Sequence, residues 1–216
     1  MLFRSDFTPV TVVVRNVGHV LVVNNSVPAK SVKELVALAK ANPGKLNYGS
    51  AGNGNVLHLA AEIFSGIAGV KMTHIPYKGA ANAMTDLVGG QIDVCFPPAP
   101  TAVSLVQAGR VRALGITATQ RWARLPDVPT LDEAGVKGHH YSAWYALWFP
   151  SGVPGEYVER FYREVSAVLN DPEVRRFYDE QGLIPVGNRP EEFARLIRDE
   201  LEFNRRLTTR MGVVPE

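Results

Sequence analysis

Short strand-like runs alternate regularly with helix-like segments through the middle of this 216-residue chain. The strand-like runs lie at 46–49, 71–76, 91–96 and 111–117, and helix-periodic segments occupy the intervals between them. Repeated β-α units of this length predict a mostly parallel sheet with helices on both of its faces. Ligands of such sheets bind beyond the carboxyl ends of the strands, so the loops that follow the strands are the candidate ligand-binding segments.

The regular alternation stops on both sides of this module. Residues 8–23 predict two β-branched strands, and three helices are predicted after residue 150. We therefore expect three segments: 1–25 as the remnant of a first lobe, 26–117 as an intact second lobe, and 118–216 as a return to the first lobe that adds the C-terminal helices. Because two strands and a few helices make a poor hydrophobic core, the first lobe is predicted to be incomplete.

Local signals mark two of the helix starts. Ser31 and Glu34 form a Ser-x-x-Glu capping box. Asp171 precedes Pro172, which combines a favoured N-cap residue with proline at the first helical position. Between them, residues 121–138 are expected to form a looping connection with one short helical stretch at 131–134.

Composition narrows the function classes. Apolar residues make up 46% of the chain, which supports an ordinary packed core, and the net charge of +2 argues against a nucleic-acid partner. The single cysteine, Cys95, excludes an internal disulfide and a cysteine-rich zinc site. No metal or cofactor is expected. No apolar run is long enough to span a bilayer, and Met1–Ser5 does not form a signal peptide.

Two glycine-containing turns each connect a predicted strand to a predicted helix. The first runs from Ser50 to Asn55 and the second from Tyr77 to Ala80. Glycine lets backbone N–H groups approach a ligand closely, and a helix start adds unpaired donors and the positive end of the helix dipole. Such turns suit a carboxylate or a phosphate. The candidate ligand-binding residues are Ser50, Gly52, Asn53, Gly54, Asn55, Tyr77, Lys78, Gly79 and Ala80.

A structural role is the alternative for each of these features. Glycine-rich turns are common in α/β domains, and most of them bind nothing. Neither turn has the Gly-Lys-Ser/Thr of a P-loop or the glycine spacing of a dinucleotide-binding loop. For Lys78, an ordinary solvent-exposed side chain is as good an explanation as a ligand contact, because lysine is normally exposed. Packing or capping is the better explanation for His58, and core packing for Trp144 and Trp148.

No catalytic residues are expected. The five histidines lack metal-ligand spacing, and the sequence contains neither a Gly-x-Ser-x-Gly nucleophile elbow nor a cysteine–histidine signature. The chain is therefore interpreted as a binding protein rather than an enzyme.

A series of short phrases gives the sequence a family resemblance. Their order along the chain makes the match specific, and it runs from Asp6 to the C-terminus. The phrases are DFTPVT from Asp6, VPAKSVKEL from Val27, NPGKLNY from Asn42, SAGNG from Ser50 with His58-Leu59, PYKG from Pro76, GQID from Gly90, LPDVPT from Leu125 and DPEV from Asp171. The chain resembles the substrate-binding receptors of tripartite tricarboxylate transporters, also called the Bug family.

The resemblance implies a type II periplasmic-binding-protein-like α/β fold, with two lobes of mostly parallel sheets that close on a ligand like a Venus flytrap. It implies a periplasmic receptor, monomeric when full-length, that captures a small carboxylate and delivers it to the membrane permease subunits of the transporter. Family members also begin with a secretion signal and a first-lobe carboxylate loop. This chain has neither, so it is interpreted as an N-terminally truncated fragment.

The resemblance also bears on the site. Ser50–Asn55 and Tyr77–Ala80 match the family's second-lobe ligand loops. Two departures are visible: the family usually has Ser or Thr where Asn55 stands, and Pro97 and Pro98 replace an acidic or amide residue that is common after the preceding strand. The ligand is left open among tricarboxylates, dicarboxylates, acidic amino acids, aromatic diacids and vitamin-like acids.

Two other functions remain open at this point. One is the ligand-sensing effector domain of a transcription regulator, which requires a helix-turn-helix before this chain. The other, which the residues favour less, is an enzyme with an α/β fold. The sequence upstream of residue 1 distinguishes them, because a signal peptide indicates a receptor and a helix-turn-helix indicates a regulator.

Overall fold

The computed structural model describes residues 6–211, so the expectation for Met1–Ser5 lies outside the described residues. The chain forms two compact units. The smaller unit contains the described residues up to Asn16 together with Ala143–Arg206, and the larger unit contains Val17–Ser142 together with the described residues from Leu207 to Met211. These boundaries differ from the expected ones, which lay after residues 25 and 117.

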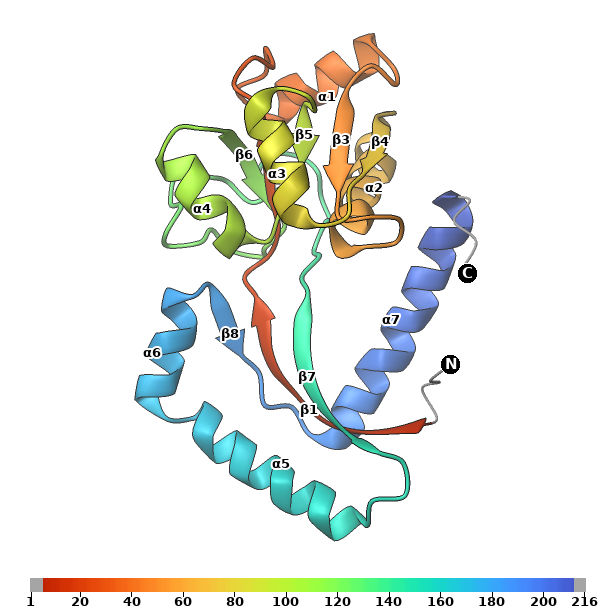
Figure 1. The fold of residues 1–216 in the computed structure, drawn as a ribbon, viewed down its shortest axis with the longest axis vertical. Coiled ribbons are helices and arrows are strands. Elements are labelled where there is room, and N and C mark those ends of the chain that lie inside the picture. The colour runs from red at the N-terminus through yellow and green to blue at the C-terminus, as the bar shows by residue number, and fades with distance from the viewer. Residues whose placement is uncertain (1–5, 212–216) are drawn as a thin grey trace. The chain divides into compact units, whose positions relative to one another are not determined.

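A five-stranded sheet forms the centre of the larger unit (Figure 1). Its strands are β2 (Val20–Val23), β3 (Asn47–Ser50), β4 (Thr73–Pro76), β5 (Val94–Cys95) and β6 (Arg112–Ile116). They lie in the order β4-β3-β5-β2-β6. β3 is parallel to β4 and β5, whereas β2 is antiparallel to β5 and β6. Only β2 therefore runs against the other strands, which confirms the predicted mostly parallel sheet.

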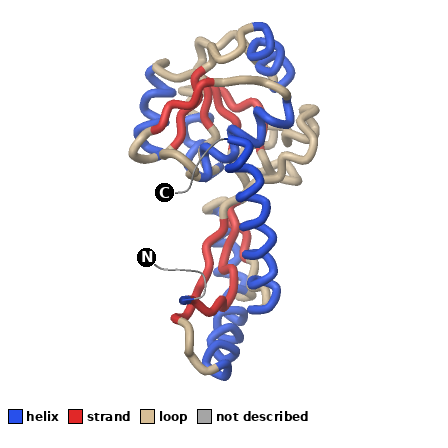
Figure 2. The backbone as a smooth tube through the Cα atoms, turned by 90° about the vertical axis from the view of Figure 1, so that its right-hand side faces the viewer, coloured by secondary structure: helices blue, strands red, loops and turns tan. Residues whose placement is uncertain are grey.

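Helices lie on both sides of this sheet (Figures 1 and 2). They are α1 (Val32–Ala41), α2 (Val56–Ala68), α3 (Ala80–Gly89) and α4 (Ala99–Gln107). Because side chains alternate between the two faces of a strand, each face builds its own core. Leu21 and Val23 of β2 cluster with residues of α1 and α2, whereas Val20 and Val22 cluster with residues of α3 and α4. The sheet is thus a buried layer between two hydrophobic cores.

Two segments expected in the first lobe belong to the larger unit instead. β2 falls within the predicted remnant 1–25, yet it pairs between β5 and β6, because its four apolar residues are buried on both faces. Residues 118–142 stay with the same unit because Leu131 is fully buried over β6. A Cβ added to Gly115 would lie 2.7 Å from Cδ2 of Leu131, so a larger residue at this position would require the Leu131 side chain to shift. The short helix expected at 131–134 is a series of turns.

The smaller unit has a three-stranded sheet in the order β7-β1-β8. Its strands are β1 (Phe7–Asn16), β7 (Trp144–Pro150) and β8 (Leu183–Pro185). Both pairings are antiparallel, so the expected parallel arrangement is confined to the larger unit. Three helices follow as predicted: α5 (Gly155–Leu169), α6 (Pro172–Glu180) and α7 (Pro190–Met211). No helix in the described part of the chain is both long and apolar enough to span a membrane.

The core of the smaller unit is small and aromatic. Val12, Phe193 and Ile197 are its buried apolar residues, and Trp144 and Trp148 pack against them. The two indole rings lie 5.3 and 4.7 Å from the Phe193 ring, both edge-on. The Trp144 indole N–H also donates a 2.7 Å hydrogen bond to Glu200. These contacts confirm core packing as the role of both tryptophans.

Large apolar side chains remain exposed mainly in the smaller unit. Of the ten such side chains in the described chain, Ile67 alone belongs to the larger unit. The other nine are Phe7, Tyr145, Tyr157, Phe161, Val168, Phe177, Ile184, Leu201 and Phe203. The smaller unit therefore has apolar side chains that its own elements do not cover.

Candidate functional site

Two loops leave the same edge of the larger sheet next to each other (Figure 1). β3 and β4 are parallel neighbours, and Ser50 at the end of β3 is paired with Pro76 at the end of β4. The loop to α2 therefore begins beside the loop to α3. The Tyr77 N–H donates a 3.0 Å hydrogen bond to the Ser50 carbonyl, and a Cβ added to Gly52 would lie 3.6 Å from the Tyr77 carbonyl oxygen. The structure thus brings the two predicted loops together.

The first loop reaches α2 through two glycines with left-handed backbone. Gly52 has φ of 117° and Gly54 has φ of 71°, a region that side chains disfavour. Asn53 and Gly54 are exposed at the tip of the loop. Asn55 is the N-cap of α2, since its side-chain oxygen accepts a 3.0 Å hydrogen bond from the Leu57 N–H. This explains why asparagine is accepted here: it is a good N-cap residue.

The second loop starts α3 without a side-chain cap. Gly79 is the N-cap residue, and its φ of 171° is ordinary extended backbone. Ala80 is half-buried and begins the helix. In the described chain, the backbone N–H groups of Asn53, Val56, Ala80 and Ala81 have no hydrogen-bond partner. Unpaired N–H groups of this kind are what a helix start offers to an anion.

Ser50 lies beneath the first loop rather than on its surface. Its side chain is fully buried, and its hydroxyl is 2.6 Å from His74 Nε2. The same hydroxyl accepts a hydrogen bond from the Gly52 N–H at 3.1 Å and lies 3.0 Å from the Gly52 carbonyl. In this structure Ser50 therefore fixes the shape of the loop, which differs from the expected contact between its hydroxyl and a ligand.

The side chains of the second loop have different environments. The Tyr77 hydroxyl donates a 2.8 Å hydrogen bond to Asp86 of α3. Partial burial and the neighbouring Asp86 carboxylate raise the pKa of Tyr77 to about 12, so the phenol stays neutral. Lys78 is exposed, and it forms no ion pair with any described residue. Its charge is therefore available to an approaching anion.

Two histidines lie directly below the first loop. His58 of α2 is 5% exposed, and its Nδ1 accepts a 3.0 Å hydrogen bond from the Gly54 N–H. Its ring stacks on His74 at 3.8 Å between centroids, with 9° between the planes. Burial lowers the pKa of His58, while burial and the charge of His58 lower the pKa of His74 to about 4. The packing and capping predicted for His58 are confirmed.

His74 was not among the predicted site residues. It lies on β4 opposite Tyr48 of β3, and the two rings stack at 5.0 Å. Nothing in the sequence around His74 distinguishes it from other strand residues. The pairing of β3 with β4 places it under the loop, and that register is a tertiary feature.

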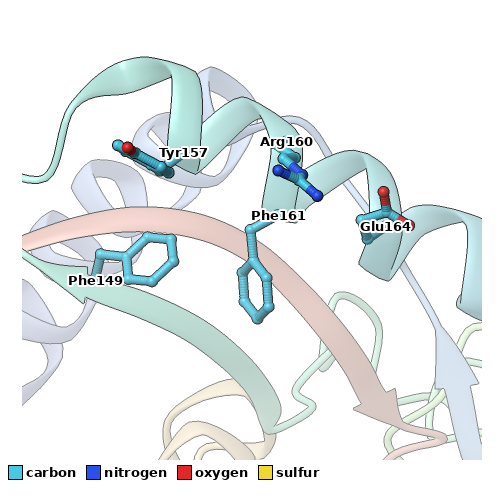
Figure 3. Close-up of a pocket in the computed structure, with 5 residues that line it drawn as sticks. All are labelled: Phe149, Tyr157, Arg160, Phe161 and Glu164. Atoms are coloured by element: carbon cyan, nitrogen blue, oxygen red, sulfur yellow. The ribbon is translucent and has the colours of Figure 1, made fainter.

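A separate hollow of about 240 Å³ lies in the smaller unit (Figure 3). It is lined by residues of β7 and α5, namely Phe149, Tyr157, Arg160, Phe161 and Glu164. The Phe149 and Phe161 rings lie 5.3 Å apart and form its apolar part. None of the predicted ligand-binding residues lines it, so it belongs to the uncovered apolar surface of this unit.

Comparison with known proteins adds to this geometry. A protein-family model described as "Tripartite tricarboxylate transporter family receptor" matches residues 2–213. A UPF0065 protein in the tcbD-tcbE intergenic region of Pseudomonas sp. strain P51 is 36% identical over 198 residues, which are 91% of this chain and 59% of that relative. Two further curated relatives are covered over 52% and 66% of their lengths. The chain therefore spans less than two thirds of these relatives.

Solved structures show the same fold. A structure described as R. palustris Rpa4515 with adipate is 33% identical, with a TM-score of 0.87 over 98% of this chain and 70% of that one. The periplasmic binding protein BugD is 30% identical, with a TM-score of 0.82 over 97% of this chain and 71% of that one. These likenesses confirm the expected periplasmic-binding-protein-like α/β fold.

Proposed function

Because the chain belongs to the tripartite tricarboxylate transporter receptor family, we propose that it is part of a periplasmic receptor that captures a small carboxylate. The observation that carries this proposal is the pair of neighbouring helix starts, where the N–H groups of Asn53, Val56, Ala80 and Ala81 have no partner in the described chain. The R. palustris relative was solved with adipate, a dicarboxylate that such donors suit.

The two helix starts supply both direction and charge. The macrodipole of a helix places partial positive charge at its N-terminus. α2 and α3 contribute such a dipole over 13 and 10 residues. N–H donors form short, strong hydrogen bonds with a carboxylate because the acceptor is charged. One ligand carboxylate therefore lies against the two loops. Lys78 adds a solvent-screened attraction and is a secondary contributor.

The glycines keep the approach to these donors open. Gly54 and Gly79 have no atoms within 4 Å of where a Cβ would lie, so a ligand meets backbone there rather than side chain. Gly52, Asn55 and Tyr77 give the loops their shape through the contacts described above. The function proposed is binding without catalysis, cofactor or metal.

The remaining parts of the proposal rest on the family. We assign the larger unit to the second lobe and the smaller unit to an incomplete first lobe. Its exposed apolar side chains are consistent with that assignment. The receptor delivers its ligand to the membrane permease subunits of the transporter and acts as a monomer. Because two-lobed receptors gain affinity by closing both lobes on the ligand, the 216 residues alone are expected to bind carboxylates weakly or not at all.

A substitution at Gly79 tests this site most cleanly. Gly79→Val places a side chain into open space at extended backbone, so the fold tolerates it while the Ala80 and Ala81 N–H groups are obstructed. Gly89→Val is the matched control, since it adds the same side chain into open space at the other end of α3. In a version extended to the length of the relatives, calorimetry with adipate should show at least a tenfold loss for Gly79→Val alone.

Lys78→Ala completes the test. Its expected effect is smaller, a loss of about 1 kcal/mol or less, because the charge is exposed. Normal binding by Gly79→Val together with lost binding by Lys78→Ala would replace the helix-start mechanism with a lysine-centred ion pair. A thermal-shift screen with other small carboxylates then identifies the acid that is bound best, since ligand binding to the native state raises stability.

A further inference from the structure

The first loop is held from below by hydrogen bonds to two stacked imidazoles. His58 Nδ1 accepts the Gly54 N–H at 3.0 Å, and His74 Nε2 lies 2.6 Å from the Ser50 hydroxyl, which accepts the Gly52 N–H. The two rings are parallel to within 9°. Each histidine is therefore connected to a different residue of the same loop.

The hydrogen bond of His58 fixes its chemical state. A backbone N–H only donates, so Nδ1 must be unprotonated and the ring proton must lie on Nε2. The Ser50 hydroxyl can donate or accept, so the contact of His74 tolerates either tautomer. Of the two rings, His58 is the one whose protonation directly removes a contact to the loop.

We propose that His58 is a positioning residue of the ligand loop. Its neutral ring, supported by the stacked ring of His74, turns the Gly54 N–H inward and thereby leaves the Asn53 and Val56 N–H groups for the carboxylate. Protonation of Nδ1 puts a donor against a donor and releases the loop, so carboxylate capture weakens in acid. The link to capture rests on the proposed function, whereas the loop contact itself does not.

The groups around the His58 ring disfavour its protonation. His74 lies on one face of the ring, and Tyr48 of β3 stacks at 6.1 Å. The Tyr48 hydroxyl donates to Glu62 of α2 at 2.5 Å, which engages that carboxylate. Burial lowers the pKa of His58, and a positive charge on either histidine opposes protonation of the other. The loop is therefore held at neutral pH and released only as the pH falls below the ordinary histidine range.

Two substitutions separate positioning from general stability. His58→Asn places a side-chain oxygen near the position of Nδ1, so it keeps the acceptor for Gly54 and removes the titration. His58→Leu keeps a comparable apolar volume and removes the acceptor. A purely structural role would make both variants similar, whereas a positioning role predicts rescue by asparagine.

The first measurement is made on the 216-residue chain labelled with ¹⁵N-glycine. At pH 7 the Gly54 amide should be protected from solvent exchange, should exchange at least about tenfold faster in His58→Leu, and should recover protection in His58→Asn. On acidification the Gly54 resonance should shift in the wild-type chain and stay in place in His58→Asn. An unprotected Gly54 amide, or one that His58→Leu leaves unchanged, overturns the proposal.

The second measurement titrates adipate into uniformly labelled wild-type and variant proteins, each extended to the length of the relatives as in the Gly79 test, and follows the Asn53 and Ala80 amides. His58→Leu should weaken adipate binding at least about tenfold, and His58→Asn should restore binding and make it independent of pH. Unchanged binding in His58→Leu overturns the link to capture. If the extended wild-type protein does not respond to adipate while Gly54 behaves as expected, the positioning role stands and the proposed carboxylate function fails.

Discussion

The larger and smaller units differ most in what their helices bury. Among the described residues, the two hydrophobic clusters of the larger unit contain 18 and 16 buried residues, whereas the cluster of the smaller unit contains three. α6 buries no residue, and α5 buries only Val158 and Leu169. Yet α6 begins with the Asp171 side-chain cap and a proline in its first turn, and α1 likewise begins with the Ser31 side-chain cap. The comparison therefore separates the ability to form a helix from the ability to stabilise one by packing.

The difference follows from how each unit is assembled. In the larger unit, consecutive β-α units deliver helices to both faces of one sheet, so each apolar stripe meets a partner. In the smaller unit, three antiparallel strands come from distant parts of the chain, and the apolar sides of α5 and α6 stay partly exposed. Helices in proteins gain most of their stability from burying an amphipathic face. The smaller unit is thus expected to be much less stable by itself.

Amide hydrogen exchange measures this difference directly and gives the largest expected effect. Amides of β3 and β5 should open only with global unfolding of the larger unit, whereas amides of β1, β7 and α5 should exchange through local opening. We expect the two sets to differ by on the order of 5 kcal/mol in opening free energy, comparable to the total stability of a small domain. Equal protection in both units would contradict the comparison.

A matched pair of phenylalanine substitutions gives the next largest effect. Phe64 of α2 is fully buried and lies 5.5 Å from the Phe96 ring, whereas Phe177 of α6 is 57% exposed. Phe64→Ala should lower the free energy of unfolding of the larger unit by about 3–5 kcal/mol, through lost burial and a cavity. Phe177→Ala should change stability by less than about 0.5 kcal/mol. Urea denaturation of both variants tests this, and similar losses at the two sites would overturn it.

Acidification should destabilise the larger unit, because burial lowers the pKa values of four of its histidines, namely His19, His58, His74 and His139. Burial lowers the pKa of His19 from 6.5 to about 4. Below pH 6.5 the His19 side chain binds a proton in the unfolded chain but not in the native state. The free energy of unfolding therefore decreases as the pH is lowered to about 4. For a group shifted this far, the full loss is on the order of 3 kcal/mol.

Urea denaturation between pH 7 and pH 5 tests this before most carboxylates titrate. His19→Gln should reduce the slope of stability against pH. A glutamine at His140, which is exposed and contacts Asp132 at 3.1 Å, is the control for removing a histidine at the surface. If the slope is unchanged in His19→Gln, the burial of His19 is not its cause.

Much of the larger unit was predictable because its signals are local. The alternation of short strands and helices, the capping box at Ser31 and the glycine turns each depend on residues close in sequence. Ser31 accepts the Glu34 N–H at 3.2 Å, and Glu34 reaches back to the Lys30 N–H at 2.7 Å. The placement of both loops at one edge follows from the parallel order of their strands.

The features that escaped prediction depend on contacts between distant residues. A β-branched run such as β2 fits either sheet, and only its burial on both faces assigns it to the larger one. The burial of Ser50 and the stacking of His74 on His58 depend on the register between β3 and β4. β8 has three residues, too few to give a periodic signal. Local reasoning found where the loops lie but not what holds them.

Two N-cap substitutions give the smallest expected effect and the sharpest form of the comparison. Ser31 caps α1, which buries Val32, Leu35 and Ala39, whereas Asp171 caps α6, which buries nothing. Losing an N-cap costs about 1 kcal/mol of helix stability in either case. Because α1 melts only when its core opens, Ser31→Ala should lower the free energy of unfolding of the larger unit by that amount.

Asp171→Ala should accelerate amide hydrogen exchange in α6 alone and leave global unfolding unchanged. An equal global loss in the two variants would mean that α6 is coupled to a core despite its exposure, and the smaller unit would then be more cooperative than its burial indicates.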